Sequence, residues 1–217
     1  MSFHLVIAVR GGPDAKSRLA ARLDALGREA LVEAMLVDML TAAAESRLVR
    51  RAYVSTPTPS LAELAVRLGA IAMPERASGD LNAAFEAARR RIAAADPDAV
   101  VALLPGDLPR LSARELDSGL QAASLGRAVL VPALADGGTG AVIAPARLPL
   151  PLAFGPGSFE KHLAAAAILG LSVEVAPAPS LGFDLDRPSD LDAYLALGGG
   201  GRTAQALRVG CARETAA

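Results

Sequence analysis

Three aspartates stand where apolar runs of the sequence end, and their arrangement favours a divalent metal site. Asp107 comes shortly after the apolar run Ala99–Leu104. Asp184 and Asp186 are one residue apart, so in extended backbone their side chains point to the same face. Neighbouring, partly buried carboxylates need a compensating cation, and Mg²⁺ prefers oxygen ligands of this kind. Simpler roles stay open, because Asp107 also fits a turn, Asp184 a solvated loop and Asp186 the cap of a helix beginning near Pro188.

A glycine-rich loop with basic residues follows the first apolar run. The backbone N–H groups of Gly11 and Gly12 are unobstructed by a Cβ atom, and Arg10, Lys16 and Arg18 add positive charge around them. A loop of this composition, placed before a helix, suits a polyphosphate. Its spacing matches neither the dinucleotide-binding GxGxxG pattern nor the P-loop. A plain turn is the alternative interpretation.

Two further loops combine glycines with a single hydroxyl. They read Asp136-Gly-Gly-Thr-Gly140 and Phe154-Gly-Pro-Gly-Ser-Phe159. Backbone amides together with Thr139 or Ser158 would hold a small anion such as a phosphate or a carboxylate. A hairpin turn and a helix cap explain the same residues equally well.

Strand-length apolar runs alternate with helical stretches, which predicts an α/β fold with a mostly parallel sheet and helices on both faces. In such sheets, ligands bind at the carboxyl ends of the strands, where the loops above are expected to lie. We expect a single domain over residues 1–197 and a Gly-rich, flexible C-terminal tail over residues 198–217. The expected strands are Phe3–Val9, Val49–Ser55, Ala99–Leu104, Ala128–Pro132, Gly140–Ala144 and Ser172–Ala176. The expected helices are Arg28–Glu45, Pro59–Leu68, Asp80–Ala95, Ser112–Ser124, Ser158–Leu169 and one opening near Pro188.

Composition excludes several classes of protein. The 217 residues carry a formal net charge of −1 and only 3% aromatic residues, which argues against a nucleic-acid partner. The first apolar run is too short for a signal peptide or a membrane span, so we expect a cytoplasmic protein without a membrane partner. Cys211 is the single cysteine and excludes an internal disulfide. The oligomeric state stays open, a homodimer included.

A series of short motifs resembles the guanylyltransferases of coenzyme F420 biosynthesis over about residues 3–197. The resemblance lies in the order and spacing of Ala15–Leu19, Leu81–Asn82, Leu104–Pro109, Gly138–Gly140, Phe154–Phe159 with His162, and Asp184–Leu191. It implies a nucleotidyltransferase fold of the nucleotide-diphospho-sugar transferase-like, Rossmann type. It also implies Mg²⁺ as cofactor and, as substrates, GTP and a small phosphorylated carboxylic acid: 2-phospho-L-lactate, phosphoenolpyruvate or 3-phospho-D-glycerate. The products would be a guanosine diphospho-acid and pyrophosphate.

The resemblance also assigns roles to residues. Asp107, Asp184 and Asp186 would bind the metal, and Lys16 and Arg18 would face the triphosphate, with Lys16, Arg18 and Asp107 catalytic. Thr139, Gly155 and Ser158 would bind the acceptor, and Arg10, Gly11, Gly12, Lys16 and Asn82 the nucleotide. Asn82 equally fits a helix cap. We expect guanine selection to come from backbone groups of the first loop and of the segment Met73–Asn82, where Pro74, Ser78, Gly79 and Asn82 interrupt the helical pattern.

Some positions depart from the family pattern and keep other functions open. The family usually has Val-Pro-Val-Lys where this chain has Ala8-Val9-Arg10, and Thr-Asn where Ala141-Val142 stand. Another Mg²⁺-dependent nucleotidyltransferase such as a molybdenum-cofactor type guanylyltransferase, a nucleotide-sugar glycosyltransferase, and a nucleotide-binding module without catalysis are the alternatives. The two histidines point to no further chemistry: His4 fits a structural role, and His162 either approaches the acceptor or packs.

Overall fold

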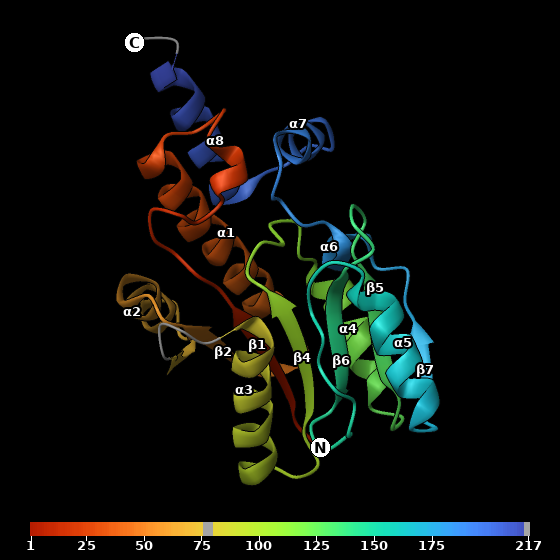
Figure 1. Cartoon of the computed structure of the whole chain (residues 1–217). Coiled ribbons are helices and arrows are strands. Elements are labelled where there is room, and N and C mark those ends of the chain that lie inside the picture. Colours follow the sequence, from red (N-terminus) through yellow and green to blue (C-terminus); the bar gives the residue numbers. More distant parts are fainter. Residues whose placement is uncertain (76–79, 215–217) are drawn as a thin grey trace.

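Residues 1–75 and 80–214 are described in a computed structural model, with residues 210–214 described as backbone only. Within these residues the chain forms a seven-stranded sheet in the order β3-β2-β1-β4-β6-β5-β7 (Figure 1). Among the described strands β6 alone runs antiparallel, against both β4 and β5. The strands are β1 (Phe3–Ala8), β2 (Val49–Thr56), β3 (Ile71–Pro74), β4 (Val100–Pro105), β5 (Ala128–Pro132), β6 (Thr139–Pro145) and β7 (Val173–Val175).

Helices cover both faces of the sheet, as predicted (Figure 1). On β1, Leu5 and Ile7 point to the face covered by α1 and α4, whereas Val6 and Ala8 point to the face covered by α3 and α5. This alternation follows from the two-residue period of a strand, and burial on both faces explains the nearly continuous apolar runs. The helices are α1 (Ala25–Glu45), α2 (Pro59–Arg67), α3 (Leu81–Ala95), α4 (Ala113–Ala123), α5 (Ser158–Ile168), α6 (Pro179–Gly182), α7 (Pro188–Ala196) and α8 (Gly201–Glu214), with a 3₁₀ turn η1 (Ser17–Leu19).

Local caps explain most helix starts. Helix α1 begins at Ala25, three residues before the predicted start, because Asp24 accepts a hydrogen bond from the Gly27 N–H. Helix α7 begins at Pro188, as predicted. Its first turn is capped by Asp190, which accepts from the backbone N–H groups of Asp186 and Arg187. The Asp186 side chain is therefore not the cap of this helix.

The prediction of a flexible tail over residues 198–217 is wrong for the part that the structure describes. Residues 201–214 form α8, which packs along α1, with Leu207 buried in the core. The Asp38 carboxylate on α1 accepts hydrogen bonds from the N–H groups of Arg202 and Thr203, both at 2.8 Å. The cap therefore comes from a distant helix, and residues near the tail carry no local sign of it.

Two other differences concern strand β3 and the β5–β6 connection. Strand β3 was not predicted, because four residues are too few for a periodic signal. Strands β5 and β6 form an antiparallel hairpin, so the loop containing Gly137 and Gly138 is its turn. Ser78, Gly79 and residues 215–217 lie outside the described residues, as does the side chain of Cys211. In residues 1–75 and 80–214, no helix has the length and apolar character needed to cross a membrane.

Candidate functional site

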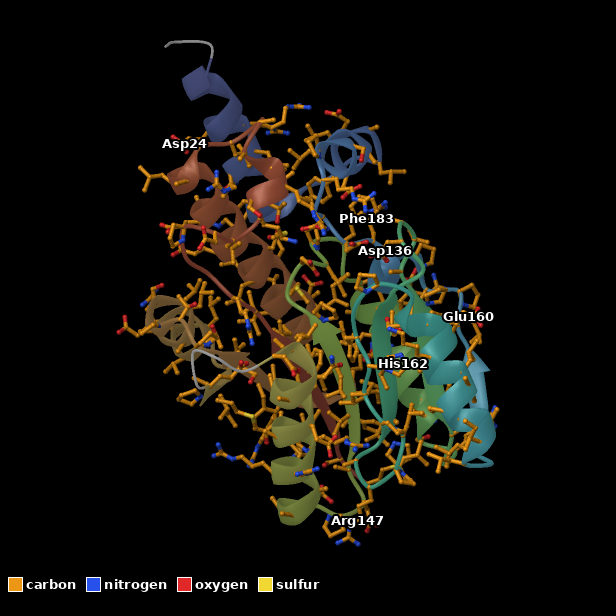
Figure 2. All side chains as sticks on the ribbon, viewed as in Figure 1. Asp24, Asp136, Arg147, Glu160, His162 and Phe183 are labelled. Atoms are coloured by element: carbon orange, nitrogen blue, oxygen red, sulfur yellow. The ribbon has the colours of Figure 1, made fainter. Side chains whose placement is uncertain are left out.

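The loops predicted to carry chemistry gather at one end of the sheet. Figure 2 shows Asp136 and Phe183 at this end, with Arg147 at the opposite end. The loops after β1, β3 and β4 border a cavity of about 420 Å³, which we call the edge cavity. Its lining includes Arg10, Lys16, Glu75, Asp107 and Asp186 together with apolar residues of β1, α1 and α3. The topology explains this convergence, because β1 lies between β2 and β4 and all three are parallel.

Lys16 is the cation at the centre of the predicted acidic cluster. Its Nζ lies 2.7 Å from Asp107 Oδ2 and 3.4 Å from Asp186 Oδ1, and its side chain is only 10% exposed. Burial alone would lower the pKa of Lys16, but the two carboxylates outweigh it and hold that pKa above its usual value. The same ion pairs, together with Arg18, overcome burial and lower the pKa of Asp186. Lys16 and Asp186 are therefore both charged at neutral pH.

The backbone around Lys16 is held in place from α1. Lys16 has a φ of 52°, the only non-glycine residue of the described chain in the left-handed region. The Arg28 guanidinium donates hydrogen bonds to the carbonyl groups of Pro13, Ala15 and Leu23, at 2.8, 3.2 and 3.0 Å. Because these carbonyls flank Lys16 on both sides, Arg28 fixes the loop in the conformation that presents the Lys16 amine to the acids.

Asp107 and Asp184 each have a buried oxygen that lacks a hydrogen-bond partner, Oδ1 in both cases. Burial and the nearby Asp107 carboxylate raise the pKa of Asp184 to about 6. Both oxygens of Asp186, by contrast, are bound by Lys16 and Arg18. In the described part of the chain, no three His, Cys, Asp or Glu side chains are gathered as metal ligands, so the predicted three-acid group is not formed. Of the three acids predicted to bind the metal, Asp107 and Asp184 are the two with an unpartnered oxygen.

Arg10, Gly11 and Gly12 do not form the open cradle that their composition favours. Arg10 Nη2 lies 3.5 Å from Glu75 Oε2. The Gly11 N–H donates to Thr58 Oγ1 at 3.1 Å, so a side chain of the protein already uses it. Gly12 has a φ of 107° and closes a turn by accepting from the Ala15 N–H.

The two glycine-rich loops meet through a buried polar group of three side chains. Thr139 Oγ1 lies 2.9 Å from both Ser158 Oγ and His162 Nδ1, and His162 Nε2 accepts from the Ala153 N–H at 3.0 Å. Since Nε2 is an acceptor, the proton of the neutral ring is on Nδ1, and burial lowers the pKa of His162 to about 4. Figure 2 shows His162 on α5 next to the sheet. Thr139 and Ser158 thus lie together, with His162 orienting the pair, and their binding of the acceptor stays a prediction.

Gly155 and Asn82 complete this loop. Gly155 is exposed and has a φ of 134°, a conformation that an L-residue rarely adopts. Asn82 donates to the Phe154 carbonyl at 3.1 Å and accepts from the Phe154 N–H at 2.6 Å. Both ends of the Asn82 amide are therefore used on the loop backbone. This differs from the two predicted roles, a contact to nucleotide and a helix cap, and the cap of α3 is in fact Asp80.

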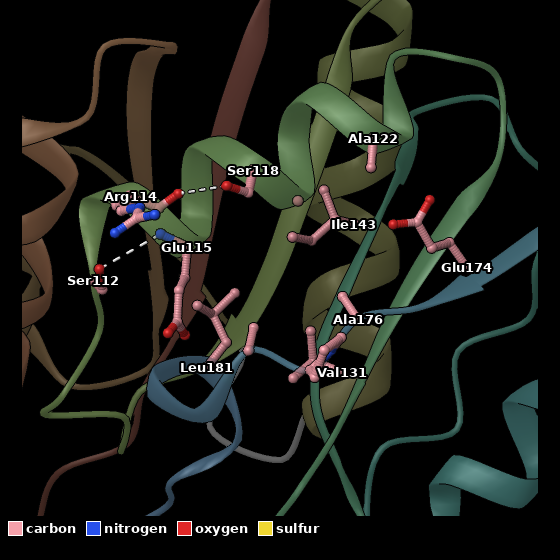
Figure 3. A pocket seen from close by; sticks show the side chains of 13 residues that line it. Ser112, Arg114, Glu115, Ser118, Ala122, Val131, Ile143, Glu174, Ala176 and Leu181 are labelled. Atoms are coloured by element: carbon pink, nitrogen blue, oxygen red, sulfur yellow. Dashed lines mark hydrogen bonds between the residues drawn. The ribbon is translucent and has the colours of Figure 1, made fainter.

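A second cavity, about 580 Å³, lies between α4, α6 and β7 (Figure 3). Its polar groups are largely engaged with the protein. Glu115 accepts hydrogen bonds from the N–H and hydroxyl of Ser180, and Glu174 pairs with Arg127. No residue predicted for the site lines it, so the edge cavity is the better candidate despite its smaller volume.

Sequence reasoning missed Arg28, Glu75 and the positioning role of His162. Glu75 directly follows β3, and without that strand its place at the end of the sheet was hidden. Arg28 lies 12 residues beyond Lys16, and its contacts depend on the folded path of the loop. His162 carried a weak signal, one helical turn after Ser158 on a predicted helix.

Comparison with known proteins places the chain in a family. It matches the family described as "Guanylyl transferase CofC like" over residues 3–211. It is 44% identical over 204 residues to the 3-phospho-D-glycerate guanylyltransferase of Phenylobacterium zucineum, covering 93% of this chain and 94% of that protein. It is 40% identical over 200 residues to the phosphoenolpyruvate guanylyltransferase of Rubrobacter xylanophilus, covering 92% and 96%.

Solved structures confirm the predicted fold. A nucleotide-diphospho-sugar transferase described as putative, from Desulfovibrio desulfuricans, superposes with a TM-score of 0.80 at 19% identity over 96% of this chain and 95% of that one. A nucleotidyl transferase from Methanothermobacter thermautotrophicus gives 0.63 at 17% identity over 90% and 99%. The fold is thus the α/β nucleotidyltransferase fold, and the chain belongs to the CofC-like family of guanylyltransferases.

Proposed function

We propose that this protein transfers the guanylyl group of GTP to a small phosphorylated carboxylic acid, releasing pyrophosphate, as a step of coenzyme F420 biosynthesis. The observation that carries the proposal is the group of Lys16, Asp107 and Asp186 at the edge cavity, with the unpartnered oxygens of Asp107 and Asp184. The names of the two relatives support 3-phospho-D-glycerate or phosphoenolpyruvate as the acceptor. 2-Phospho-L-lactate has the same pair of acidic groups and stays a third candidate.

The chemistry needs positioning and charge more than proton transfer. A phosphate oxygen of the acceptor attacks the α-phosphorus of GTP, and the bond from that phosphorus to the pyrophosphate oxygen breaks. The attacking oxygen is already anionic, so a general base is unnecessary. Lys16 supplies a positive charge, desolvated and fixed in place by Arg28, next to which the charge of the leaving pyrophosphate develops.

Mg²⁺ is the metal that these residues fit. Asp107 and Asp184 would hold it, because each has a buried, unpartnered oxygen, and two carboxylates plus substrate phosphates are a usual set of Mg²⁺ ligands. When bound, Mg²⁺ neutralises charge on the phosphates and so lowers the barrier to attack. The raised pKa of Asp184 is consistent with a site that lacks enough positive charge on its own.

The two glycine-rich loops are the proposed acceptor site. Phe159 N–H bonds to the Gly137 carbonyl, which joins the loops side by side at the start of α5. The N-terminus of α5 favours an anion, and Thr139 and Ser158 fix the shape of the loops around it. An acid with one phosphate and one carboxylate would place one group here and direct the other toward the edge cavity.

Substrate pairing tests the proposal. The purified protein with MgCl₂ would be given GTP, ATP, CTP or UTP together with each of the three acids, and pyrophosphate release and product mass would be measured. We expect pyrophosphate with GTP and the mass of a guanosine diphospho-acid. Turnover with another nucleotide but not with GTP would contradict the proposal.

Asp107→Asn separates an enzyme from a module that only binds nucleotide. We expect kcat to fall by about 100-fold or more while the fold is retained, because the variant loses charge at the reacting phosphates. Asp192→Asn, at an exposed acid of α7, is the matched control and should leave turnover unchanged. A wild-type protein that binds GTP yet forms no product with any of the acids would support the binding module instead.

A further inference from the structure

We propose that Glu75 and Arg10 recognise the Watson–Crick edge of guanine and thereby select GTP. The inference rests on the proposed function and names the groups that choose its nucleotide.

The Glu75 carboxylate is a buried acceptor without a matching donor. The side chain is 9% exposed, and Oε2 has no hydrogen-bond partner among the described residues. Arg10 Nη2 lies 3.5 Å away, close enough for an ion pair but outside hydrogen-bond geometry, and its side chain is 44% exposed. A buried charged group without a hydrogen bond is costly, so a ligand that donates to Glu75 would be stabilised here.

Each of the other acids that line the edge cavity has a hydrogen-bond partner, although Asp107 also has the unpartnered Oδ1 that we assign to Mg²⁺. Asp107 and Asp186 bind Lys16, and Asp80 caps α3 by accepting from the Ala83 N–H at 2.8 Å. Glu75 is the lining acid that combines burial with an unused oxygen at the β3 side of the cavity.

The chemistry of the four bases favours guanine at this pair. Guanine presents two neighbouring donors, N1–H and the N2 amino group, beside the acceptor O6. A carboxylate accepts both donors at once, and an adjacent guanidinium donates to O6. On this edge adenine presents one donor group beside one acceptor, cytosine one donor group beside two acceptors, and uracil one donor between two acceptors. None of them offers a carboxylate two neighbouring donors, and an acceptor facing the carboxylate would be repelled. Glu75 and Arg10 lie side by side, with Arg10 Nη2 3.5 Å from Glu75 Oε2, and so place the acceptor and the donor that the guanine edge requires next to each other.

The sheet places this pair at a suitable distance from the phosphate end. Glu75 follows β3 and Asp107 follows β4, with β2 and β1 between them. Adjacent strands lie about 4.8 Å apart, so the two strand ends are roughly 14 Å apart, which accommodates a base, a ribose and the first phosphates. Val9, Leu81 and Ala84 line the same cavity and offer apolar contacts to the faces of a base.

Glu75→Gln tests the assignment, with GTP and inosine triphosphate compared. Inosine triphosphate keeps O6 and N1–H but lacks the N2 amino group. We expect the wild-type enzyme to prefer GTP over inosine triphosphate by about 10-fold or more in kcat/KM. In Glu75→Gln the KM for GTP should rise about 10- to 100-fold, and the preference over inosine triphosphate should shrink, because the amide accepts weakly at one oxygen only. Glu63→Gln, at an exposed glutamate of α2, is the matched control.

Arg10→Met provides an independent readout on a more exposed side chain. Loss of the donor to O6 should raise the KM for GTP and for inosine triphosphate by the same factor, since both carry O6. An unchanged KM for GTP together with an unchanged preference over inosine triphosphate in folded Glu75→Gln would overturn the assignment. If that variant does not fold, an unchanged KM for GTP in Arg10→Met would overturn it. A wild-type protein that uses no GTP would instead refute the proposed function, so the two failures are distinguishable.

Discussion

Lowering the pH tests whether the buried imidazole of His162, which joins the two glycine-rich loops, is held in its neutral form. The ring is fully buried, and its Nε2 accepts from the Ala153 N–H, so a second ring proton would have to face that donor. Burial accordingly lowers the pKa of His162 from 6.5 to about 4 in the folded protein. A group whose pKa is lower in the folded state contributes stability that is complete above the unfolded pKa and is lost as the pH falls.

The magnitude follows from the two pKa values. Protonation is easier in the unfolded chain than in the folded one between pH 6.5 and pH 4. The loss in the free energy of unfolding is about 2 kcal/mol at pH 5 and about 3 kcal/mol at pH 4, relative to pH 7.

Urea unfolding of the wild type and of His162→Gln, followed by circular dichroism between pH 7 and pH 4, measures this loss. Glutamine does not titrate, so the difference between the two proteins in the free energy of unfolding should shrink by these amounts as the pH falls. Carboxylates such as Asp186, whose pKa is lowered, titrate in both proteins and cancel in the difference. Parallel pH curves would show that His162 is not held neutral by burial, and the described orientation of Thr139 would lose its basis.

Three further substitutions probe the parts that hold the site. Asn82→Ala removes both hydrogen bonds to the Phe154 backbone, so steady-state kinetics should show the KM for the acceptor acid raised about 10-fold and the KM for GTP raised less. A larger effect on the KM for GTP would contradict the role of Asn82 in holding the acceptor loop. Gly140→Ala would place a Cβ atom 2.1 Å from the Leu181 carbonyl oxygen, so it should lower the free energy of unfolding by about 3 kcal/mol or more. A urea midpoint equal to that of the wild type would refute this close approach. Asp38→Ala removes the cap of α8, so it should lower the free energy of unfolding by about 1–2 kcal/mol and speed proteolysis within residues 201–214. An unchanged digestion rate would show that the cap is dispensable.

The parts of the fold that the sequence predicts are those with local causes. The apolar run at Ala99–Leu104 becomes β4, because a strand buried on both faces needs apolar residues at consecutive positions. The start of α7 at Pro188 was likewise visible, since proline at the first helical position and nearby acids are local signals. Helix α8 was missed because its cap, Asp38, lies on another helix.

In the candidate site, too, some features have local causes in the sequence and others depend on contacts between distant residues. The sequence predicted that Asp107, Asp184 and Asp186 would converge on a metal, and the family resemblance placed Lys16 against the triphosphate. In the part of the chain that the structure describes, the three acids do not gather as metal ligands, and Lys16 bonds to Asp107 and Asp186 instead. What sequence reasoning did not foresee was the partner of each group. Lys16 lies between two acids that were expected to share a metal. Arg10 pairs with Glu75, which directly follows β3, a strand too short to be predicted from the sequence. Such pairings depend on distances of a few ångström that residue types and spacing do not determine.

A crystal structure with Mg²⁺ and the α,β-methylene analogue of GTP, whose reacting bond cannot be cleaved, tests the central claim most directly. We expect its triphosphate beside Lys16, its metal on Asp107 and Asp184, and its guanine edge against Glu75 and Arg10. A nucleotide bound in the cavity between α4 and α6, with the edge cavity free of phosphate, would contradict the claim.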